Sequence, residues 1–105
     1  MLDSLLDSLS TIHALGEKAL QFIDSGEDPA RFLDMLDEYL KQLESWQKEN
    51  REYLASVSDN TVPITDSERG VLRTSLEEVK ILHSKLMERS QGLMNEVHSE
   101  LGNIN

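Results

Sequence analysis

Apolar residues recur along most of this chain in alternating steps of three and four, and two short stretches without this rhythm divide it into three segments; Gln47 and Asn50 interrupt the second segment. Residues with this spacing share one face of an α-helix, so the pattern predicts helices and no sheet. A chain of 105 residues has room for one hydrophobic core. We therefore predict an all-α fold, a single domain over residues 1–105 in which an antiparallel bundle is formed by three long helices at about 2–24, 29–57 and 66–102.

The first predicted helix shows the clearest seam. Its apolar stripe, including one glycine, consists of Leu2, Leu5, Leu9, Ile12, Gly16, Ala19 and Ile23. Further apolar residues flank this seam, which makes the stripe wider than a two-stranded coiled coil requires. We expect this helix to pack against more than one neighbour.

Two breaks separate the helices. Residues 24–29 contain a glycine suited to a helix C-terminus, followed by an Asp-Pro pair suited to the next N-cap and first helical position. This short reversal predicts that the first two helices form an antiparallel hairpin. Residues 58–66 are rich in turn formers, and Thr65 followed by Glu68 fits a capping box at the start of the third helix.

The second predicted helix carries two competing stripes. One is a leucine seam that contains Leu33, Leu36, Leu40, Leu43, Leu54 and Val57. The other is an aromatic ridge at seven-residue spacing, formed by Phe32, Tyr39, Trp46 and Tyr53. The ridge is either core, covered by the other two helices, or partly open as a docking surface, because Tyr and Trp dominate binding hot spots.

The third predicted helix is the longest, with lengths of roughly 33, 43 and 54 Å expected for the three at 1.5 Å per residue. Its last turns, from about Gly92, must project past the hairpin, bend or fold back. Apolar residues there lack an assured partner, and such a stripe usually marks a binding surface. The candidate partner-binding residues on this helix are Leu86, Met87, Leu93, Met94, Val97, Leu101 and Ile104, and Tyr39, Trp46 and Tyr53 join them from the second helix.

Charge and composition exclude several classes of function. The formal net charge is −10, which argues against nucleic-acid binding because phosphate recognition uses Lys and Arg clusters. The chain has no cysteine, so a reducing compartment is compatible. It has no apolar run near the ~20 residues needed to span a bilayer, and acidic residues stand where a signal peptide would be basic. We expect a cytoplasmic protein without membrane insertion.

The residues most suited to catalysis or metal binding are scattered along the chain. His13, His83 and His98 show no ligand spacing, and no phosphate-binding loop or nucleophile turn occurs, so we predict no catalytic, cofactor or metal site and no enzyme activity. His83 falls on a helical seam, where a partly buried, hydrogen-bonded imidazole is the ordinary explanation. The segment around His13 faintly resembles the phosphoryl-accepting segment of histidine phosphotransfer bundles, but the lysine of that motif is missing and Glu17 would repel a phosphoryl group.

The whole layout resembles the small export chaperones of the bacterial flagellar type III secretion system, of the FliT and FlgN kind. The resemblance lies in the acidic N-terminal helix, the break at Asp24 to Pro29, the long helix with Leu36, Leu40, Leu43 and Trp46, and the final helix from Leu72 to Leu101. It covers nearly the whole chain but includes no diagnostic residue signature.

The resemblance implies a cytoplasmic chaperone that holds the helical C-terminal segment of a flagellar cap or hook-associated subunit and delivers it to export-gate proteins. By position, the family's recognition helix would fall on residues 86–104, which lack the tyrosine that relatives use in gate contact. The mechanism would be capture of an amphipathic helix in an apolar groove. The alternative is a structural protein whose exposed stripe mediates self-association into a homodimer or tetramer, and the remote alternative is phosphotransfer through His13.

Overall fold

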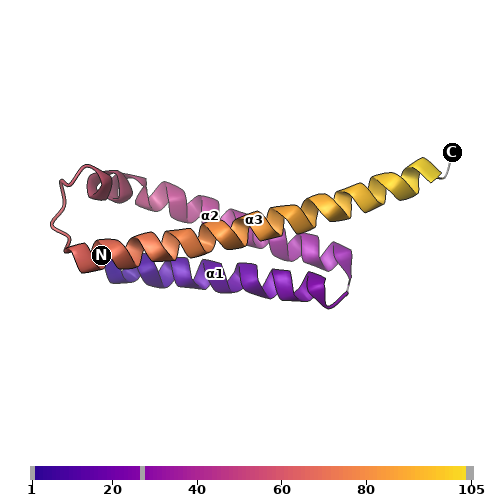
Figure 1. The fold of residues 1–105 in the computed structure, drawn as a ribbon, viewed down its shortest axis with the longest axis horizontal. Coiled ribbons are helices and arrows are strands. Elements are labelled where there is room, and N and C mark those ends of the chain that lie inside the picture. The colour runs from indigo at the N-terminus through magenta and orange to yellow at the C-terminus, as the bar shows by residue number, and fades with distance from the viewer. Residues whose placement is uncertain (1, 27, 104–105) are drawn as a thin grey trace.

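The computed structural model describes residues 2–26 and 28–103, with side-chain exposure for 2–26 and 28–96. This part of the chain contains three helices and no strand: α1 (Leu2–Asp24), α2 (Pro29–Ser58) and α3 (Asp66–Asn103) (Figure 1). The predicted all-α fold is confirmed. Each helix begins and ends within one residue of its predicted boundary.

Local capping interactions set these boundaries. Before α2, the Asp28 carboxylate accepts a hydrogen bond from the Ala30 amide at 3.0 Å, and Gly26 adopts a positive φ of 76° that ends the previous turn. Before α3, the Thr65 hydroxyl accepts from the Glu68 amide at 3.1 Å, and the Glu68 carboxylate accepts from the Thr65 amide at 3.0 Å. This reciprocal pair is the predicted capping box.

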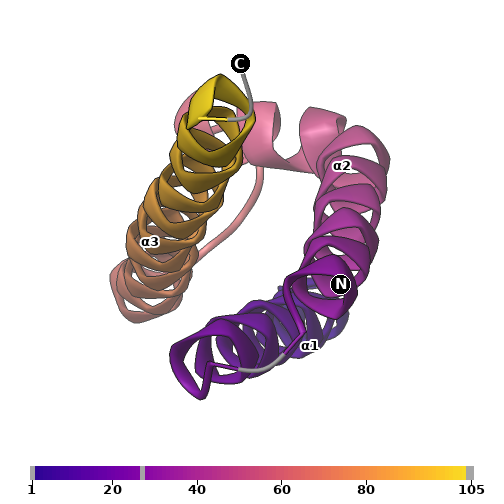
Figure 2. The same cartoon turned by 90° about the vertical axis from the view of Figure 1, so that its right-hand side faces the viewer.

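The three helices are not equivalent in their packing. α1 contacts both α2 and α3 along much of its length, whereas α2 and α3 touch far less. In Figure 1, α3 crosses in front of α2, and Figure 2 shows α2 and α3 spread apart on either side of α1. The Cα radius of gyration is 17.2 Å, against about 13 Å for a compact domain of this length. The bundle is therefore elongated and open, with α1 as its central helix.

The core consists of one layer of apolar side chains between α1 and its two neighbours. Buried hydrophobic residues are Leu5, Leu9, Ile12 and Ala19 from α1, Phe32, Leu36, Tyr39, Trp46 and Val57 from α2, and Leu72, Val79, Leu82 and Leu86 from α3. The predicted seam of α1 is confirmed at its centre, and so is its contact with two neighbours. The core interpretation of the aromatic ridge is confirmed for Phe32, Tyr39 and Trp46, while Tyr53 is half-buried.

The leucine seam predicted for α2 is wrong at two positions. Leu33 and Leu40 are 40% and 36% exposed. They lie about 100° around the helix from Phe32 and Tyr39. Because α2 packs along α1 but makes far less contact with α3, the aromatic face is covered and the adjacent leucine face is not.

Gly16 permits the closest approach within the core. A Cβ atom at this position would lie 2.7 Å from Cδ2 of Leu82 and 3.0 Å from Cε2 of Tyr39. These distances are shorter than ordinary van der Waals contacts. Glycine at this position therefore lets Tyr39 of α2 and Leu82 of α3 approach the backbone of α1 at the same point along its length. The Tyr39 ring occupies the space that a side chain would need.

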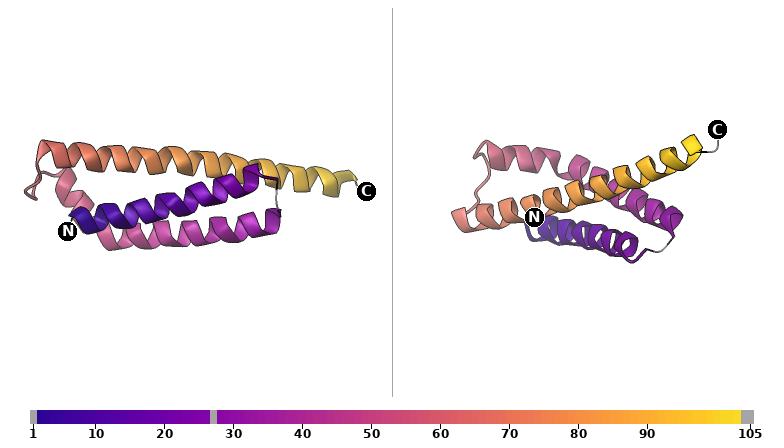
Figure 3. Two further views of the ribbon diagram at one scale, coloured as in Figure 1. Left: turned by 90° about the horizontal axis from the view of Figure 1, so that it is seen from below. Right: turned by 45° about the vertical axis from the view of Figure 1, so that its right-hand side comes forward.

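The C-terminal part of α3 projects past the hairpin. The helix continues through Gly92 to Asn103, and Figures 1 and 3 show its last turns extending beyond the turn that joins α1 and α2. Of the three arrangements considered for this segment, projection is the one observed. Within the described residues, none of the three helices combines the length and apolar character needed to cross a bilayer.

Candidate partner-binding grooves

A groove of about 670 Å³ runs between α2 and α3, above α1. We call it the α2–α3 groove. It is lined by Leu9 from α1, by Leu40, Leu43, Glu44, Trp46 and Gln47 from α2, and by Leu76, Val79, Lys80, His83 and Ser84 from α3. The divergence of α2 and α3 seen end-on in Figure 2 leaves this space between them.

The floor of the groove is apolar and fixed in place. Trp46 is only 5% exposed, and its indole N–H donates a hydrogen bond to the Leu5 carbonyl of α1 at 3.3 Å. Leu9 and Val79 are buried beside it. Leu40 forms an accessible part of the wall at 36% exposure. Leu9, Trp46 and Val79 retain at most 7% of their surface in solvent, so the accessible apolar surface of the groove lies mainly on its walls.

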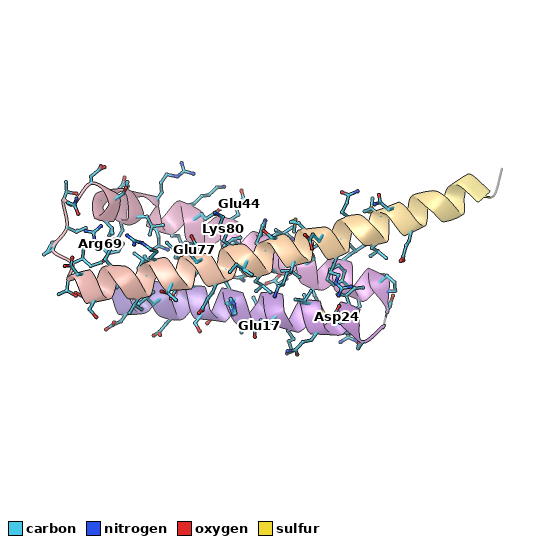
Figure 4. All side chains as sticks on the ribbon, viewed as in Figure 1. Glu17, Asp24, Glu44, Arg69, Glu77 and Lys80 are labelled. Atoms are coloured by element: carbon cyan, nitrogen blue, oxygen red, sulfur yellow. The ribbon has the colours of Figure 1, made fainter. Side chains whose placement is uncertain are left out.

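The rim of the groove is polar. Glu44 on α2 and Lys80 on α3 lie at the same opening between the two helices (Figure 4). Glu44 forms an ion pair with Lys48, one turn along α2, at 3.2 Å. An apolar floor with charged edges is the composition expected for a surface that binds the apolar face of an amphipathic helix.

At one end of the groove, α2 and α3 are joined by Tyr39 and His83. The Tyr39 hydroxyl lies 3.2 Å from Nδ1 of His83, and the two ring centroids are 5.9 Å apart. Burial raises the pKa of the Tyr39 hydroxyl. The half-buried, hydrogen-bonded imidazole predicted for His83 is confirmed. The pair holds the two helices together at their crossing.

A second opening runs along the opposite face of α3, where it packs on α1. We call it the α1–α3 furrow. One part, of about 850 Å³, is lined by Leu20, Ile23, Asp24, Gly26, Pro29, Lys85, Glu88, Arg89, Gly92, Leu93 and Glu96. The other, of about 560 Å³, is lined by His13, Glu17, Leu20, Gln21, Glu78, Ile81, Leu82 and Lys85. The two parts share Leu20 and Lys85, so they lie next to each other along α3.

An ion pair between α1 and α3 lies in this furrow. The Asp24 carboxylate, at the end of α1, lies 2.8 Å from a guanidinium nitrogen of Arg89. Both side chains are about half exposed, so the pair contributes little to stability. It does neutralise the charge of Arg89 within the furrow.

The predicted partner-binding residues are dispersed. Leu86 and Tyr39 are buried in the core at 0% exposure, so in this structure their side chains pack within the protein. Trp46 is also a core residue, but it forms the floor of the α2–α3 groove. Side chains buried at the contacts between α1 and its neighbours are used for packing within the protein.

The remaining predicted residues occupy different environments. Tyr53 and Met87 are half-buried against the core, Leu93 is half-buried in the α1–α3 furrow, and Met94 is 44% exposed. The side chains of Val97 and Leu101, and the whole of Ile104, lie outside the described residues. Of the predicted stripe on the last turns of α3, only the side chains of Leu93 and Met94 lie within the described residues, so the stripe stays a prediction.

Sequence reasoning missed two accessible apolar residues in the openings. Leu40 was assigned to a covered seam, and Ile81, 55% exposed, was not singled out at all. Ile81 directly precedes Leu82 and lies about 100° away from the core face. An apolar residue outside the seam, in an otherwise polar row, is the signal that could have identified it.

The geometry around His13 does not favour phosphotransfer. The imidazole is half-buried, and its Nδ1 atom lies 3.4 Å from the Glu17 carboxylate. An incoming phosphoryl group would meet that negative charge. Within residues 2–26 and 28–96, no group of three or more His, Cys, Asp or Glu side chains is arranged to hold a metal ion.

The chain was compared with known proteins at the level of both sequence and structure. No protein-family model, no curated protein and no solved structure matches the chain. The candidate functional sites are therefore the two openings and the residues that line them.

Proposed function

We propose that this protein is an export chaperone or adaptor that binds one amphipathic helix of a protein partner in the α2–α3 groove. The partner would place its apolar residues against Trp46 and Leu40 and leave its polar face in solvent. Binding would keep the partner helix from aggregating or pairing prematurely. The chain would act by binding in the cytoplasm, without catalysis, cofactor or metal.

The observation that carries this proposal is the exposed apolar wall beside a preformed apolar floor. Leu40 retains 36% of its surface in solvent next to Leu43 and Leu76, which are half-buried. Exposed leucines of this kind cost the isolated protein solubility. A partner helix that covered them would remove that apolar surface from water, at about 25 cal/mol per Å².

The length of the groove limits how much of the partner it holds. From Leu40 to Gln47 the wall of α2 extends about 10 Å, or two helical turns. Two turns present two or three apolar side chains on one face. A partner segment that is disordered when free also loses conformational entropy on binding, so micromolar affinity is expected.

The resemblance to flagellar export chaperones suggests the class of partner. By that resemblance, the partner is the helical C-terminal segment of a filament cap or hook-associated subunit, and export-gate proteins are further contacts. The three-helix architecture is compatible with this class. The groove is supported by the geometry alone and would serve any partner helix of suitable pattern.

The test is a direct binding measurement with fluorescein-labelled C-terminal segments of the cap and hook-associated subunits from the same organism. Leu40→Asp would place a carboxylate on the groove wall, and we expect it to weaken binding at least tenfold while circular dichroism shows unchanged helicity. Val71→Asp is the matched control, because Val71 is 50% exposed on α3 and lines neither opening.

Trp46, the single tryptophan of the chain, gives a second readout from the groove floor. Its emission should shift when a segment binds. Equal affinity of Leu40→Asp and the unmodified protein for a bound segment would exclude the α2–α3 groove as the binding site. Binding of none of the segments would exclude the flagellar assignment. Sedimentation of the free protein as a dimer that Leu40→Asp dissociates would favour self-association instead.

A further inference from the structure

The α1–α3 furrow combines an apolar base with an excess of negative charge. Five carboxylates line it, those of Glu17, Asp24, Glu78, Glu88 and Glu96, against two cations, Lys85 and Arg89. Between them lie the apolar residues Leu20, Ile23, Ile81, Leu82 and Leu93. The furrow carries a net charge of −3 when His13 is neutral.

The few positive charges do not cancel the carboxylates. Arg89 is already engaged by Asp24 at 2.8 Å. Lys85 is then the single cation facing Glu17, Glu78, Glu88 and Glu96 among the residues that line the furrow. Glu78 on α3 and Glu17 on α1 line the same part of the furrow, and Figure 4 shows Glu17 and Asp24 along α1. Both sides of the opening are therefore acidic.

Among residues 2–26 and 28–96, the large hydrophobic side chain with the greatest exposure lies in this furrow. Ile81 is 55% exposed, more than Leu33, Leu40, Val71 or Met94, the other large hydrophobic residues that remain exposed. It lies next to Leu82, whose side chain is buried in the core. A ligand in this part of the furrow would therefore contact the exposed Ile81 side chain, with the carboxylates of Glu17 and Glu78 lining the same opening.

The length of the furrow matches a helix of several turns. From Glu78 to Glu96 its α3 side extends about 27 Å at 1.5 Å per residue. A partner helix of about 18 residues would cover the same length. This is longer than the α2–α3 groove, and it lies on the opposite face of α3.

We propose that the α1–α3 furrow binds a basic amphipathic helix of a partner protein. The partner's apolar residues would cover Ile81 and Leu93, and Lys or Arg residues on its flanks would face Glu17, Glu78, Glu88 and Glu96. The net charge of the whole chain, −10, attracts such a helix from a distance. A second copy of this chain carries the same charge and is repelled, as are anionic lipid and nucleic acid. This site is separate from the groove assigned to the proposed function.

The experiment uses an 18-residue helical peptide, labelled with fluorescein, that has leucines on one face and lysines on both flanks. Two further peptides are compared: one with glutamates in place of the lysines, and one with the same composition in scrambled order. We expect the lysine peptide to bind, with affinity that falls as salt rises from about 0.05 to 0.3 M. We expect the other two to bind at least tenfold more weakly.

The protein variants locate the site. Glu78→Lys combined with Glu88→Lys reverses two furrow charges, and we expect about tenfold weaker binding. Glu49→Lys combined with Glu52→Lys is the matched control, because it changes the net charge equally at exposed positions of α2 outside both openings. Ile81→Asp should also weaken binding, whereas Leu40→Asp should not.

Several outcomes would overturn the proposal. Equal binding of the scrambled peptide would mean simple attraction between opposite charges, and equal weakening by the two charge-reversal pairs would mean the same. Loss of binding in Leu40→Asp but not in Ile81→Asp would place the basic helix in the other groove, which would leave the proposed function intact. A dimer in sedimentation that Ile81→Asp dissociates would identify a second copy as the occupant of the furrow.

Discussion

The hydroxyl oxygen of Tyr39 lies 3.2 Å from Nδ1 of His83, and this hydrogen bond joins α2 to α3 where the two helices cross. Elsewhere these helices make little contact, because each packs on α1. On one side of the Tyr39–His83 pair the α2–α3 groove opens, with His83 at its edge. The relative position of the groove walls therefore depends on few polar contacts: this hydrogen bond, and the one that the Arg69 guanidinium of α3 donates to the Val57 carbonyl of α2.

Removal of this hydrogen bond should destabilise the fold. Tyr39→Phe keeps the buried ring but leaves His83 Nδ1 without its partner. We therefore expect the free energy of unfolding to fall by about 0.5–1.5 kcal/mol. Urea unfolding followed by Trp46 fluorescence would measure it. Tyr53→Phe is the control, since Tyr53 is half-buried with no hydrogen bond shown for its hydroxyl, and a change equal to that of Tyr39→Phe would contradict this account.

Tyr39 should also make stability sensitive to alkaline pH. Burial raises the pKa of its hydroxyl in the folded protein above the value in the unfolded chain. The unfolded chain then loses its proton first, so stability is fully present below pH 10, the ordinary tyrosine pKa, and falls as the pH rises through and above it. Thermal unfolding of the wild type across about pH 8 to 11 should show this decline, and Tyr39→Phe should flatten it. An equal decline in both proteins would contradict the prediction.

The close contact at Gly16 predicts opposite effects for two glycine substitutions. Gly16→Ala places a methyl group 2.7 Å from Leu82 Cδ2, and overpacking of a core costs about 1–3 kcal/mol. Gly70→Ala on α3 meets nothing within 4 Å and should stabilise by up to about 1 kcal/mol through helix propensity. The midpoints of thermal unfolding should therefore move in opposite directions. A higher unfolding midpoint for Gly16→Ala than for the wild type would contradict the close packing of Gly16 against Leu82 and Tyr39.

Arg69 should stabilise the loop between α2 and α3. Its guanidinium donates to the Val57 carbonyl at 2.8 Å and to the Asn60 side-chain oxygen at 2.7 Å. Asn60 itself has a positive φ of 60°, so the bond supports a less favoured backbone conformation. Arg69→Gln should lower the free energy of unfolding, measured with urea, by about 1–2 kcal/mol. Arg73→Gln, at an exposed position one turn along, should change stability far less.

The capping box of α3 should weaken under acid. Hydrogen bonds from the Thr65 backbone amide, and then from its side chain, lower the pKa of the Glu68 carboxyl below its ordinary value. The stabilisation is therefore present above the unfolded pKa of Glu68 and is lost as the pH falls through the lowered, folded value. Thermal unfolding between about pH 6 and 3 should show a smaller acid loss in Glu68→Gln than in the wild type. Glu77→Gln, exposed on the same helix, should retain the wild-type profile.

The sequence determined the local structure because local interactions decide it. The start of α2 follows from Asp28, which caps it, and from Pro29 at its first position, and the start of α3 follows from the pair Thr65 and Glu68. The hydrogen bonds that Asp28 and Thr65 make here join residues two to four positions apart. The core face of α1 also followed from spacing, because this helix has neighbours along its length on two sides. Its seam had no competing stripe.

Only the tertiary structure decided which face of α2 is buried and where the openings lie. Leucine and aromatic stripes on α2 were both suited to a core, and in the structure the aromatic stripe is the buried one, with the Tyr39 ring packed against Gly16 of α1. Likewise, the exposure of Leu40 and Ile81 follows from the angle at which α3 crosses α2 and from the side of α3 that α1 covers. Crossing angles arise from contacts between residues far apart in the chain, such as Tyr39 and His83, and periodicity along one helix carries no information about them.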